Sequence, residues 1–205
     1  MTAGNGVAGV ILAGGTGSRL GRTKQLLPVG GRPMLQHVVD TAITELDRVV
    51  VVLGHDADRV ARALRLGLGV RTVVNPHFAY GQSTSLAVGL VAVSGAEAAV
   101  VLLGDEPGVQ PGAVRAVVDA YRTTGGPVIQ ARYGGRPGHP VLLGRMVWAS
   151  LRAVQGDSGA RAVLRRHPGW VVAVELGTAP VDVDTWEDYQ LVCAGQGPPA
   201  STPGT

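Results

Sequence analysis

Residues 11–24 read Ile11-Leu12-Ala13-Gly14-Gly15-Thr16-Gly17-Ser18-Arg19-Leu20-Gly21-Arg22-Thr23-Lys24, an apolar strand that leads into glycines and then into fixed positive charge. Because Gly14, Gly15 and Gly17 lack a Cβ, the backbone can turn with positive φ and bring its N–H groups close to an anion. Arg19 and Lys24 add charge-assisted hydrogen bonds. The stretch therefore predicts a phosphate-binding loop that follows a buried strand.

The spacing of these residues excludes two common nucleotide-binding loops. A dinucleotide-binding Rossmann loop needs G-x-G-x-x-G at the start of a helix, but the third glycine comes one position late, at Gly21. A P-loop needs Lys and a hydroxyl residue directly after its last glycine, whereas Gly21 is followed by Arg22. Phosphate binding remains the prediction.

The composition is that of one folded domain. The chain has 205 residues, of which 45% are apolar and 16% charged, so it can bury one sizeable core and is not extensively disordered. We expect a flexible lead over residues 1–6, a single domain over 7–194 and a disordered tail, rich in Gly, Pro, Ser and Thr, over 195–205.

The charge pattern argues against nucleic acid as a partner. The net charge is +3, but the Lys and Arg residues are scattered singly, which suits a small polyanion such as a nucleotide. The single cysteine, Cys193, excludes an intrachain disulfide and a zinc site built from thiolates. Without a signal-peptide pattern or an apolar stretch of membrane-spanning length, we expect a cytoplasmic protein with no membrane partner.

Apolar runs alternate with helical patterns along the chain. We expect strands at 7–12, 48–53, 70–74, 98–103, 128–131 and 171–176, and helices at 33–43, 56–66, 81–93 and 113–121, around 148 and 160, and from 185. The alternation predicts an α/β fold: a doubly wound, mostly parallel sheet with helices on both faces and ligands at the carboxyl ends of the strands. Asp56 is expected to cap a helix. The pattern loosens over residues 133–145, and we expect residues 134–140 to form a loop over the site rather than part of the sheet.

The glycine-rich stretch resembles the nucleotidyltransferase signature L-A-G-G-x-x-x-R-x-G-x-x-K. Its fixed positions are filled by Leu12, Ala13, Gly14, Gly15, Arg19, Gly21 and Lys24. The continuation Lys24-Gln25-Leu26-Leu27-Pro28-Val29-Gly30-Gly31-Arg32-Pro33 is similar to the molybdenum cofactor nucleotidyltransferase family (MobA-like NTP transferases), and more to its cytidylyl than to its guanylyl members. The resemblance extends from Val7 to about Val192.

The resemblance implies a fold and a first set of site residues. The implied fold is the Rossmann-like nucleotide-diphospho-sugar transferase fold. The implied catalytic residues of the loop are Arg19 and Lys24. The implied nucleotide-binding residues of this stretch are Leu12, Ala13, Gly14, Gly15, Gly17, Ser18, Arg19 and Lys24.

A carboxylate follows the expected strand at 98–103. Asp105 stands where a buried strand meets its exit loop, and it can either bind Mg²⁺ or cap the turn before Pro107. The segment Leu103-Gly104-Asp105-Glu106-Pro107 resembles the family's L-G-D-Q-P, whose Asp is a metal ligand, and this implies a catalytic and metal-binding Asp105. Glu106 replaces the usual Gln, and we assign it no role.

A second carboxylate pair lies near the C-terminus. The segment Asp182-Val183-Asp184-Thr185-Trp186-Glu187-Asp188 resembles the family's D-x-D-T-P-E-D, with Trp in place of Pro. It implies Asp184 as the second metal ligand, with Asp182 as the fallback. Asp184 or Thr185 can also cap a helix, with Glu187 completing a capping box, and both interpretations can hold.

One further segment resembles the part of the family that contacts the nucleotide base and ribose. Gly81-Gln82-Ser83-Thr84-Ser85-Leu86 matches G-x-S-x-S-L and implies nucleotide contacts from Gly81, Ser83 and Ser85. The alternative is an ordinary Ser/Thr helix cap.

Two segments resemble the family's acceptor pocket, which binds the pterin and its phosphate. Arg136-Pro137-Gly138-His139-Pro140 matches R-G-H-P with Pro137 inserted, and Gly156-Asp157-Ser158-Gly159-Ala160-Arg161 matches G-D-x-G-x-R. The implied acceptor-binding residues are Arg136, Gly138, His139, Asp157 and Arg161. We interpret His139 as a substrate-site residue rather than a general base.

These parts together predict a Mg²⁺-dependent transfer of CMP from CTP to a molybdopterin-type cofactor, whose phosphate attacks the α-phosphorus and releases pyrophosphate. A target molybdoenzyme or its chaperone is a further expected partner. One alternative keeps the chemistry but uses GTP or a sugar or polyol phosphate acceptor. Another is a nucleotide-binding regulator or cofactor chaperone without turnover. The glycine spacing disfavours a dehydrogenase.

Overall fold

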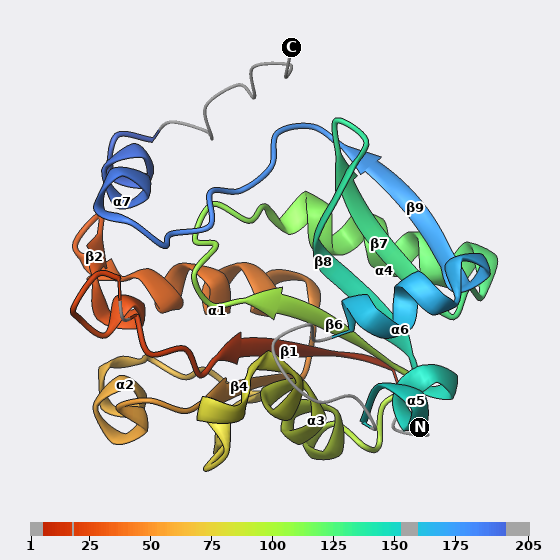
Figure 1. Ribbon diagram of the computed structural model, residues 1–205, viewed down its shortest axis with the longest axis horizontal. Coiled ribbons are helices and arrows are strands. Elements are labelled where there is room, and N and C mark those ends of the chain that lie inside the picture. The colour runs from red at the N-terminus through yellow and green to blue at the C-terminus, as the bar shows by residue number, and fades with distance from the viewer. Residues whose placement is uncertain (1–5, 18, 153–159, 196–205) are drawn as a thin grey trace.

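The computed structural model describes residues 6–17, 19–152 and 160–195. In this part of the chain a seven-stranded sheet has the order β5-β4-β1-β6-β8-β7-β9 (Figure 1). Its strands are β1 (Val7–Ala13), β4 (Val49–Leu53), β5 (Val70–Val74), β6 (Ala98–Leu103), β7 (Val128–Tyr133), β8 (Arg136–Gly144) and β9 (Val171–Leu176). β8 runs antiparallel to both of its neighbours, and the other pairings are parallel. The predicted mostly parallel, doubly wound sheet is confirmed.

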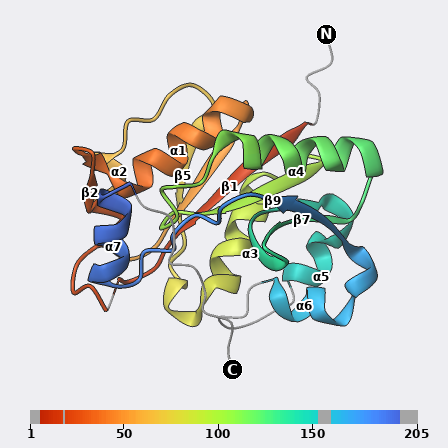
Figure 2. The same cartoon turned by 90° about the horizontal axis from the view of Figure 1, so that it is seen from above.

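Helices cover both faces of the sheet (Figure 2). α1 (Met34–Glu45) and α4 (Pro111–Thr124) pack on one face, and α3 (Gln82–Ala92), α5 (Trp148–Arg152) and α6 (Arg161–Arg166) pack on the other. The remaining elements are α2 (Ala57–Ala63), α7 (Trp186–Cys193), the short hairpin of β2 (Pro28–Val29) and β3 (Arg32–Pro33), and 3-10 turns at Lys24–Leu26, Phe78–Tyr80, Arg145–Val147 and Pro168–Trp170. No helix within the described ranges is long and apolar enough to cross a membrane.

The apolar runs form two layers of core, one on each face of the sheet. Along β1, Ile11 belongs to the layer under α1 and α4, whereas Val10 and Leu12 belong to the layer under α3. All five residues of β4 are buried, as expected for a parallel strand that is covered on both faces. Each such side chain contributes about 1.5–3 kcal/mol to the free energy of unfolding.

The loop predicted at 134–140 is wrong, because residues 136–140 belong to the strand β8. β8 lies between β6 and β7, in the interior of the sheet. Gly134 and Gly135 have positive φ, 56° and 75°, and form the tight turn of the β7–β8 hairpin. The two adjacent glycines are typical of such a hairpin turn. The first half of β8 is polar, so the sequence pattern did not indicate a strand there.

Asp56 does not cap α2, contrary to the prediction. Its φ is +56°, which makes it the one non-glycine residue with positive φ in the described ranges, and its side chain makes no hydrogen bond to the helix N-terminus. Instead Asp56 Oδ2 accepts a hydrogen bond from Thr23 Oγ1 at 2.8 Å and lies 3.4 Å from Arg59 Nη1. Asp56 thus fastens the end of the glycine-rich stretch to α2.

A third, smaller apolar cluster attaches α7 to the same stretch. It contains Leu20, Leu27, Met34 and Val183, with Tyr189 packed against it. The helix begins with the predicted capping box at Thr185, but the partner three residues later is Asp188 and not Glu187. The C-terminal segment therefore lies beside the loop after β1, although the two are distant in sequence.

We predict that Gly89→Ala lowers the free energy of unfolding. Gly89 lies where α3 crosses β1, and a Cβ there would come within 2.4 Å of Val10 Cγ1. Overpacking of this kind costs about 1–3 kcal/mol, and the higher helix propensity of Ala returns up to about 1 kcal/mol. We expect a net loss of about 1 kcal/mol, measured by urea denaturation.

Gly112→Ala in α4 is the matched control, because no atom lies within 4 Å of a Cβ built there, and it should cause no loss. Val10→Ala should relieve this contact. The double variant V10A/G89A should therefore lose less free energy of unfolding than the two single variants lose together. Equal stability of the G89A and G112A variants would contradict this account.

Candidate functional site

The site lies where the carboxyl ends of β1 and β6 meet. The two strands are parallel neighbours, and Gly104 N donates a hydrogen bond to Leu12 O across their ends at 2.9 Å. Asp105 is thereby placed beside the glycine-rich loop. Val183 N donates to Asp105 O at 3.0 Å and brings the C-terminal segment to the same point.

Three carboxylates gather there: Asp105, Asp182 and Asp184. Each offers an oxygen atom, and these oxygens lie within 4.8 Å of one another. The predicted ligands Asp105 and Asp184 are thus close together, and the fallback, Asp182, joins them. Hard oxygen donors of this kind are those that Mg²⁺ and Mn²⁺ prefer, so the donor set fits a divalent metal.

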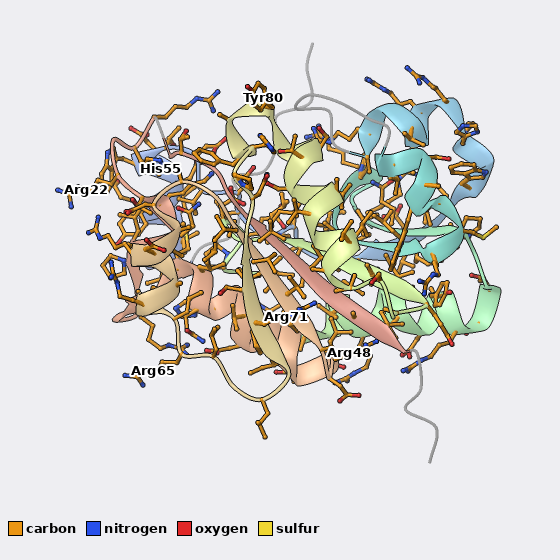
Figure 3. All side chains as sticks on the ribbon, turned by 90° about the horizontal axis from the view of Figure 1, so that it is seen from below. Arg22, Arg48, His55, Arg65, Arg71 and Tyr80 are labelled. Carbon is orange, nitrogen blue, oxygen red and sulfur yellow. The ribbon has the colours of Figure 1, made fainter. Side chains whose placement is uncertain are left out.

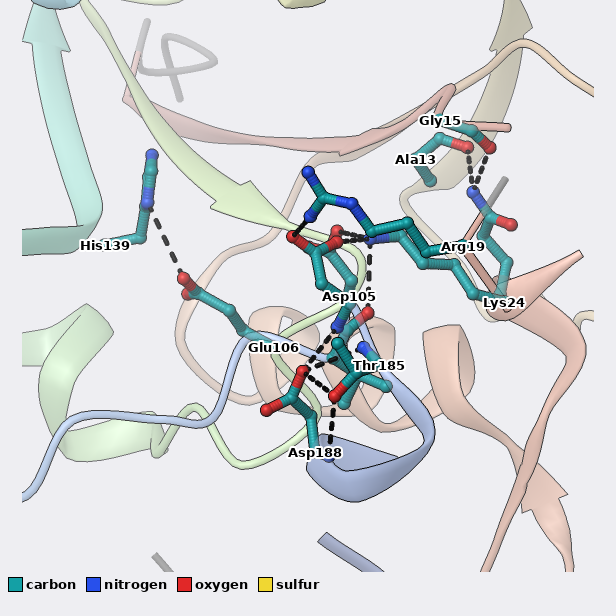
Figure 4. A network of polar contacts seen from close by, with 12 residues as sticks. Ala13, Gly15, Arg19, Lys24, Asp105, Glu106, His139, Thr185 and Asp188 are labelled. Atoms are coloured by element: carbon teal, nitrogen blue, oxygen red, sulfur yellow. Dashed lines mark hydrogen bonds and ion pairs between the residues drawn. The ribbon is translucent and has the colours of Figure 1, made fainter. Parts of the chain in front are cut away.

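Lys24 lies among these carboxylates (Figure 4). Its Nζ is 2.5 Å from Asp105 Oδ2 and 2.9 Å from Asp184 Oδ1, and its side chain is 9% exposed. Burial lowers the pKa of Lys24, but the two carboxylates raise it by more, so the net pKa lies above 10.5. Arg19 Nη1 reaches Asp184 Oδ2 at 3.2 Å. The predicted phosphate-binding cations and the predicted metal ligands therefore form one cluster.

Two more carboxyl groups at this end of the sheet have raised pKa values. Partial burial, together with Asp105 and Asp184, raises the pKa of Asp182 to about 6. Burial, followed by the charges of Asp105 and Asp182, raises the pKa of Glu106 well above 4.5. Both pKa shifts arise first from burial and second from the neighbouring carboxylates; Lys24 partly offsets the shift of Asp182, and Arg161 that of Glu106.

Gln25 fixes the shape of the loop after β1. Its buried Nε2 donates hydrogen bonds to Ala13 O and Gly15 O, both at 3.0 Å. Gly17 has φ +60°, and a Cβ there would lie 2.4 Å from Arg22 O, so the turn requires glycine. Sequence reasoning assigned no role to Gln25; the available signal was a polar residue directly before two leucines. Ser18 lies outside the described residues.

The segment predicted to contact the base also lies next to this loop. A Cβ on Gly14 would be 3.0 Å from Ser85 Oγ, and Asn75 Nδ2 donates to that same hydroxyl at 3.0 Å. Ser83 is buried, and its Oγ has no hydrogen-bond partner in the described part of the chain. α3 begins after Gly81, whose φ is +105°, without a side-chain cap.

A cavity of about 640 Å³ extends from this point over the sheet, on the face of α3 and α6. Of the predicted acceptor residues, Gly138, His139 and Arg161 line it. Arg136 is not among its lining residues, and Asp157 lies outside the described ranges. The remaining lining residues are Leu12, Gln82, Leu86, Val101, Gln130, Arg132, Pro137, Val141, Leu143, Ala160, Leu164, Arg165, Pro168, Val171 and Ala173.

Two arginines of this cavity escaped the sequence analysis. Arg132 is on β7 and Arg165 on α6, one turn after Arg161. Neither arginine belongs to a recognisable motif. Arg132 reaches the cavity only through the pairing of its strand. With Arg161 they give it a positive lining over an apolar floor.

His139 lies between the cavity and the acidic cluster. Its Nδ1 is 3.8 Å from Glu106 Oε1, and its backbone O accepts a hydrogen bond from Tyr133 Oη at 2.8 Å. Burial, followed by the charge of Arg161, lowers the pKa of His139 to about 4, so the imidazole is neutral at neutral pH. Burial and Glu106 raise the pKa of Tyr133 to about 12.

A second cavity of about 800 Å³ lies on the other side of the glycine-rich loop, toward α2. Thr16, Gly17, His55 and Asp56 contribute to its wall, as does Arg22. Figure 3 shows that Arg22 extends outward from this side of the molecule, with His55 nearby. The loop is therefore accessible from two directions.

Comparison with known proteins gives consistent results. The model of the MobA-like NTP transferase domain matches residues 9–170. Nicotine blue oxidoreductase of Paenarthrobacter nicotinovorans is 33% identical over 199 residues, which cover 91% of this chain and 96% of that protein.

Solved structures give the same picture. Rv0371c of Mycobacterium tuberculosis H37Rv is 34% identical with a TM-score of 0.82, covering 95% of this chain and all of that one. The same mycobacterial protein also has a structure in complex with manganese, at 30% identity and a TM-score of 0.79, covering 94% of this chain and 100% of that one. A nucleotidyl transferase from Methanothermobacter is 27% identical with a TM-score of 0.80, covering 94% of this chain and 98% of that one.

The loop after β1, the carboxylates beside it and these similarities agree, and they confirm the resemblance seen in the sequence. The chain belongs to the MobA-like NTP transferase family and is a nucleotidyltransferase.

Proposed function

We propose that this nucleotidyltransferase transfers CMP from CTP to the phosphate of a molybdopterin-type cofactor and releases pyrophosphate. The observation that carries the proposal is the cluster of Lys24, Asp105 and Asp184, which joins the glycine-rich loop to the acidic segments. Gly104, next to Asp105, bonds to Leu12 at the edge of the 640 Å³ cavity. Nucleotide and acceptor would meet at that edge.

Asp105 and Asp184, with Asp182, would hold Mg²⁺. The bound ion would neutralise charge on the triphosphate and orient its oxygens. The manganese complex of the mycobacterial relative supports a divalent metal in proteins of this kind.

Arg19 and Lys24 would bind the triphosphate together with the loop. In the structure both cations contact the carboxylates. A bound metal would take over those carboxylate oxygens, which leaves the ammonium and guanidinium groups available to phosphate. Gly81, Ser83 and Ser85 would contact the base and ribose, because their segment lies against Gly14.

The lining of the cavity favours a flat ring acceptor over a sugar phosphate. Its floor is apolar, from Val101, Val141, Leu143 and Val171, whereas a sugar would need polar partners for each hydroxyl. Arg132, Arg161 and Arg165 would bind anionic groups of the acceptor. The acceptor phosphate itself is a sufficient nucleophile, since its second pKa is about 6.

The relative named nicotine blue oxidoreductase makes an oxidoreductase the second candidate, since it is 33% identical over 91% of this chain. The dinucleotide-binding spacing is absent after β1, where the third glycine comes late, at Gly21. Transfer to another phosphate acceptor, use of GTP, and a regulator or chaperone without turnover are the other outcomes that an experiment must separate.

The test is incubation of the purified protein with Mg²⁺, molybdenum cofactor and either CTP or GTP, with pyrophosphate release and the dinucleotide product as readouts. We expect CTP to exceed GTP by about tenfold or more in kcat/KM. A parallel arm measures consumption of NADH and NADPH with nicotine blue. No CTP-dependent pyrophosphate release would sink the proposal, and reduction of the dye would establish the second candidate.

We predict that Asp105→Asn and Asp184→Asn each lower kcat by about 100-fold or more, because each removes an anionic metal ligand. Steady-state pyrophosphate release at saturating CTP measures the effect. Asp119→Asn on the exposed face of α4, where the carboxylate pairs with Arg122, is the control and should leave kcat within about twofold. Similar losses in all three variants would point to instability instead.

Asp182 should make the metal-free protein less stable as the pH rises. Its pKa is raised to about 6 in the folded state, so the folded chain holds the proton more tightly than the unfolded chain, and this advantage disappears between about pH 4 and pH 6. Asp182→Asn should therefore be more stable than the wild type at about pH 7.5 without metal, by about 1 kcal/mol after allowance for solvent exposure.

Chemical denaturation of the wild type and of Asp182→Asn at about pH 4 and about pH 7.5 measures this difference in the free energy of unfolding. The gain should largely vanish at about pH 4, where Asp182 is protonated in the folded state and about half protonated in the unfolded state. Mg²⁺ should reverse the order at about pH 7.5 because the wild type binds it better. A gain that is the same at both pH values would refute the electrostatic explanation.

A further inference from the structure

Glu106 is a buried carboxyl group to which the proposed reaction assigns nothing. It lies in the turn after β6, where its N donates to Leu103 O at 3.3 Å and its O accepts from Val109 N at 3.1 Å. The residue is 8% exposed. The two backbone hydrogen bonds fix the point from which the Glu106 side chain extends.

The carboxyl group of Glu106 is incompletely bonded. Oε1 lies 3.8 Å from His139 Nδ1, and Oε2 is buried without a hydrogen-bond partner in the described ranges. A buried polar atom left in this state destabilises the folded chain. Such a cost is typical of a group that serves a site, and the cavity lies directly beyond His139.

His139 is held from two directions. Tyr133 Oη donates a hydrogen bond to its backbone O, and Nδ1 of the ring faces Glu106 Oε1 at 3.8 Å, a separation that a small movement of the Glu106 side chain would reduce to a hydrogen bond. Figure 4 shows the other ring nitrogen, Nε2, turned away from Glu106. The register explains the placement: Val101 of β6 pairs with Val141 of β8, so the residues that precede Val141 run beside the end of β6.

We propose that Glu106 is a positioning residue that engages His139 at Nδ1 and so determines what Nε2 offers to the acceptor in the cavity. A neutral imidazole has one donor and one acceptor nitrogen, and the partner of one nitrogen decides the role of the other. Glu106 thereby sets the hydrogen-bonding requirement that an acceptor must meet. The part of this inference that concerns the acceptor rests on the proposed function; the part that concerns the ring does not.

The first test reads the ring directly by NMR. Long-range ¹H–¹⁵N correlation spectra of the full chain report the tautomer of each histidine, and His139→Gln assigns the signals of His139. We expect one dominant tautomer in the wild type and in Glu106→Gln, whose amide can still bond to Nδ1. In Glu106→Leu the ¹⁵N chemical shifts of both His139 ring nitrogens should move toward the values averaged over the two tautomers.

Glu45→Leu is the matched control. The Glu45 side chain is 10% exposed, as is that of Glu106, but it pairs with Arg115 and not with a histidine. The His139 signals of the Glu45→Leu variant should equal those of the wild type. Glu106→Ala replaces the leucine variant if thermal unfolding shows that E106L is not folded. His139 signals that are unchanged in the folded Leu or Ala variant would overturn the proposal.

The second test is kinetic. Glu106→Leu should raise the KM for the acceptor about tenfold, as loss of a group that orients a ligand does, and change the KM for CTP by less than about twofold. The double variant E106L/H139A should be no worse than H139A, because Glu106 acts through His139. A fall in kcat with both KM values unchanged would place Glu106 at the metal centre and refute the proposal. If no acceptor is turned over, the proposed function fails, and the NMR result still decides the role of Glu106.

Discussion

The contact of the Lys24 ammonium with the carboxylates of Asp105 and Asp184 is the constraint on which the rest of the site depends. It joins three segments that are far apart in sequence: the turn after the glycine-rich loop, the end of β6 and the start of α7. Each partner needs the others. A buried lysine without a counter-charge would shift its pKa and lose its proton, and carboxylates at this spacing repel one another without a cation.

This constraint also explains why the loop needs so much support. Gln25 donates hydrogen bonds to the backbone of the loop, and Thr23 donates one to Asp56. Leu20 and Leu27 pack against α7. Apart from Asp56, none of these residues is charged, yet together they fix where the Lys24 side chain starts. The position of one ammonium group is thus determined by both a polar and an apolar framework.

Much of the fold follows from local sequence, and the parts that do not share a physical reason. Ala98–Leu103 and Val171–Leu176 were predicted at their observed bounds because both are largely apolar. The first is buried on both faces, as such runs usually are, whereas the second is a partly exposed edge strand. The loop and Asp105 were found because short motifs mark strand ends. β8 was missed because its first half is polar. Arg132 was missed because the pairing of β7 with β8 brings it to the cavity, and the Glu106–His139 contact because it depends on the pairing of β6 with β8. Arg165 was missed because it lies on α6 outside the matched motif. The predicted roles of the site residues remain predictions.

The antiparallel course of β8 divides the sheet into two regions. On one side β6, β1, β4 and β5 carry the glycine-rich loop and Asp105. On the other side β7 gives Gln130 and Arg132 to the wall of the 640 Å³ cavity, and β9 gives Val171 and Ala173. The two regions are joined across β8 largely by main-chain hydrogen bonds, which do not depend on the identity of the side chains. The ligand wall can therefore be rebuilt residue by residue while the phosphate-handling edge stays intact, so that one scaffold can serve proteins with different substrates.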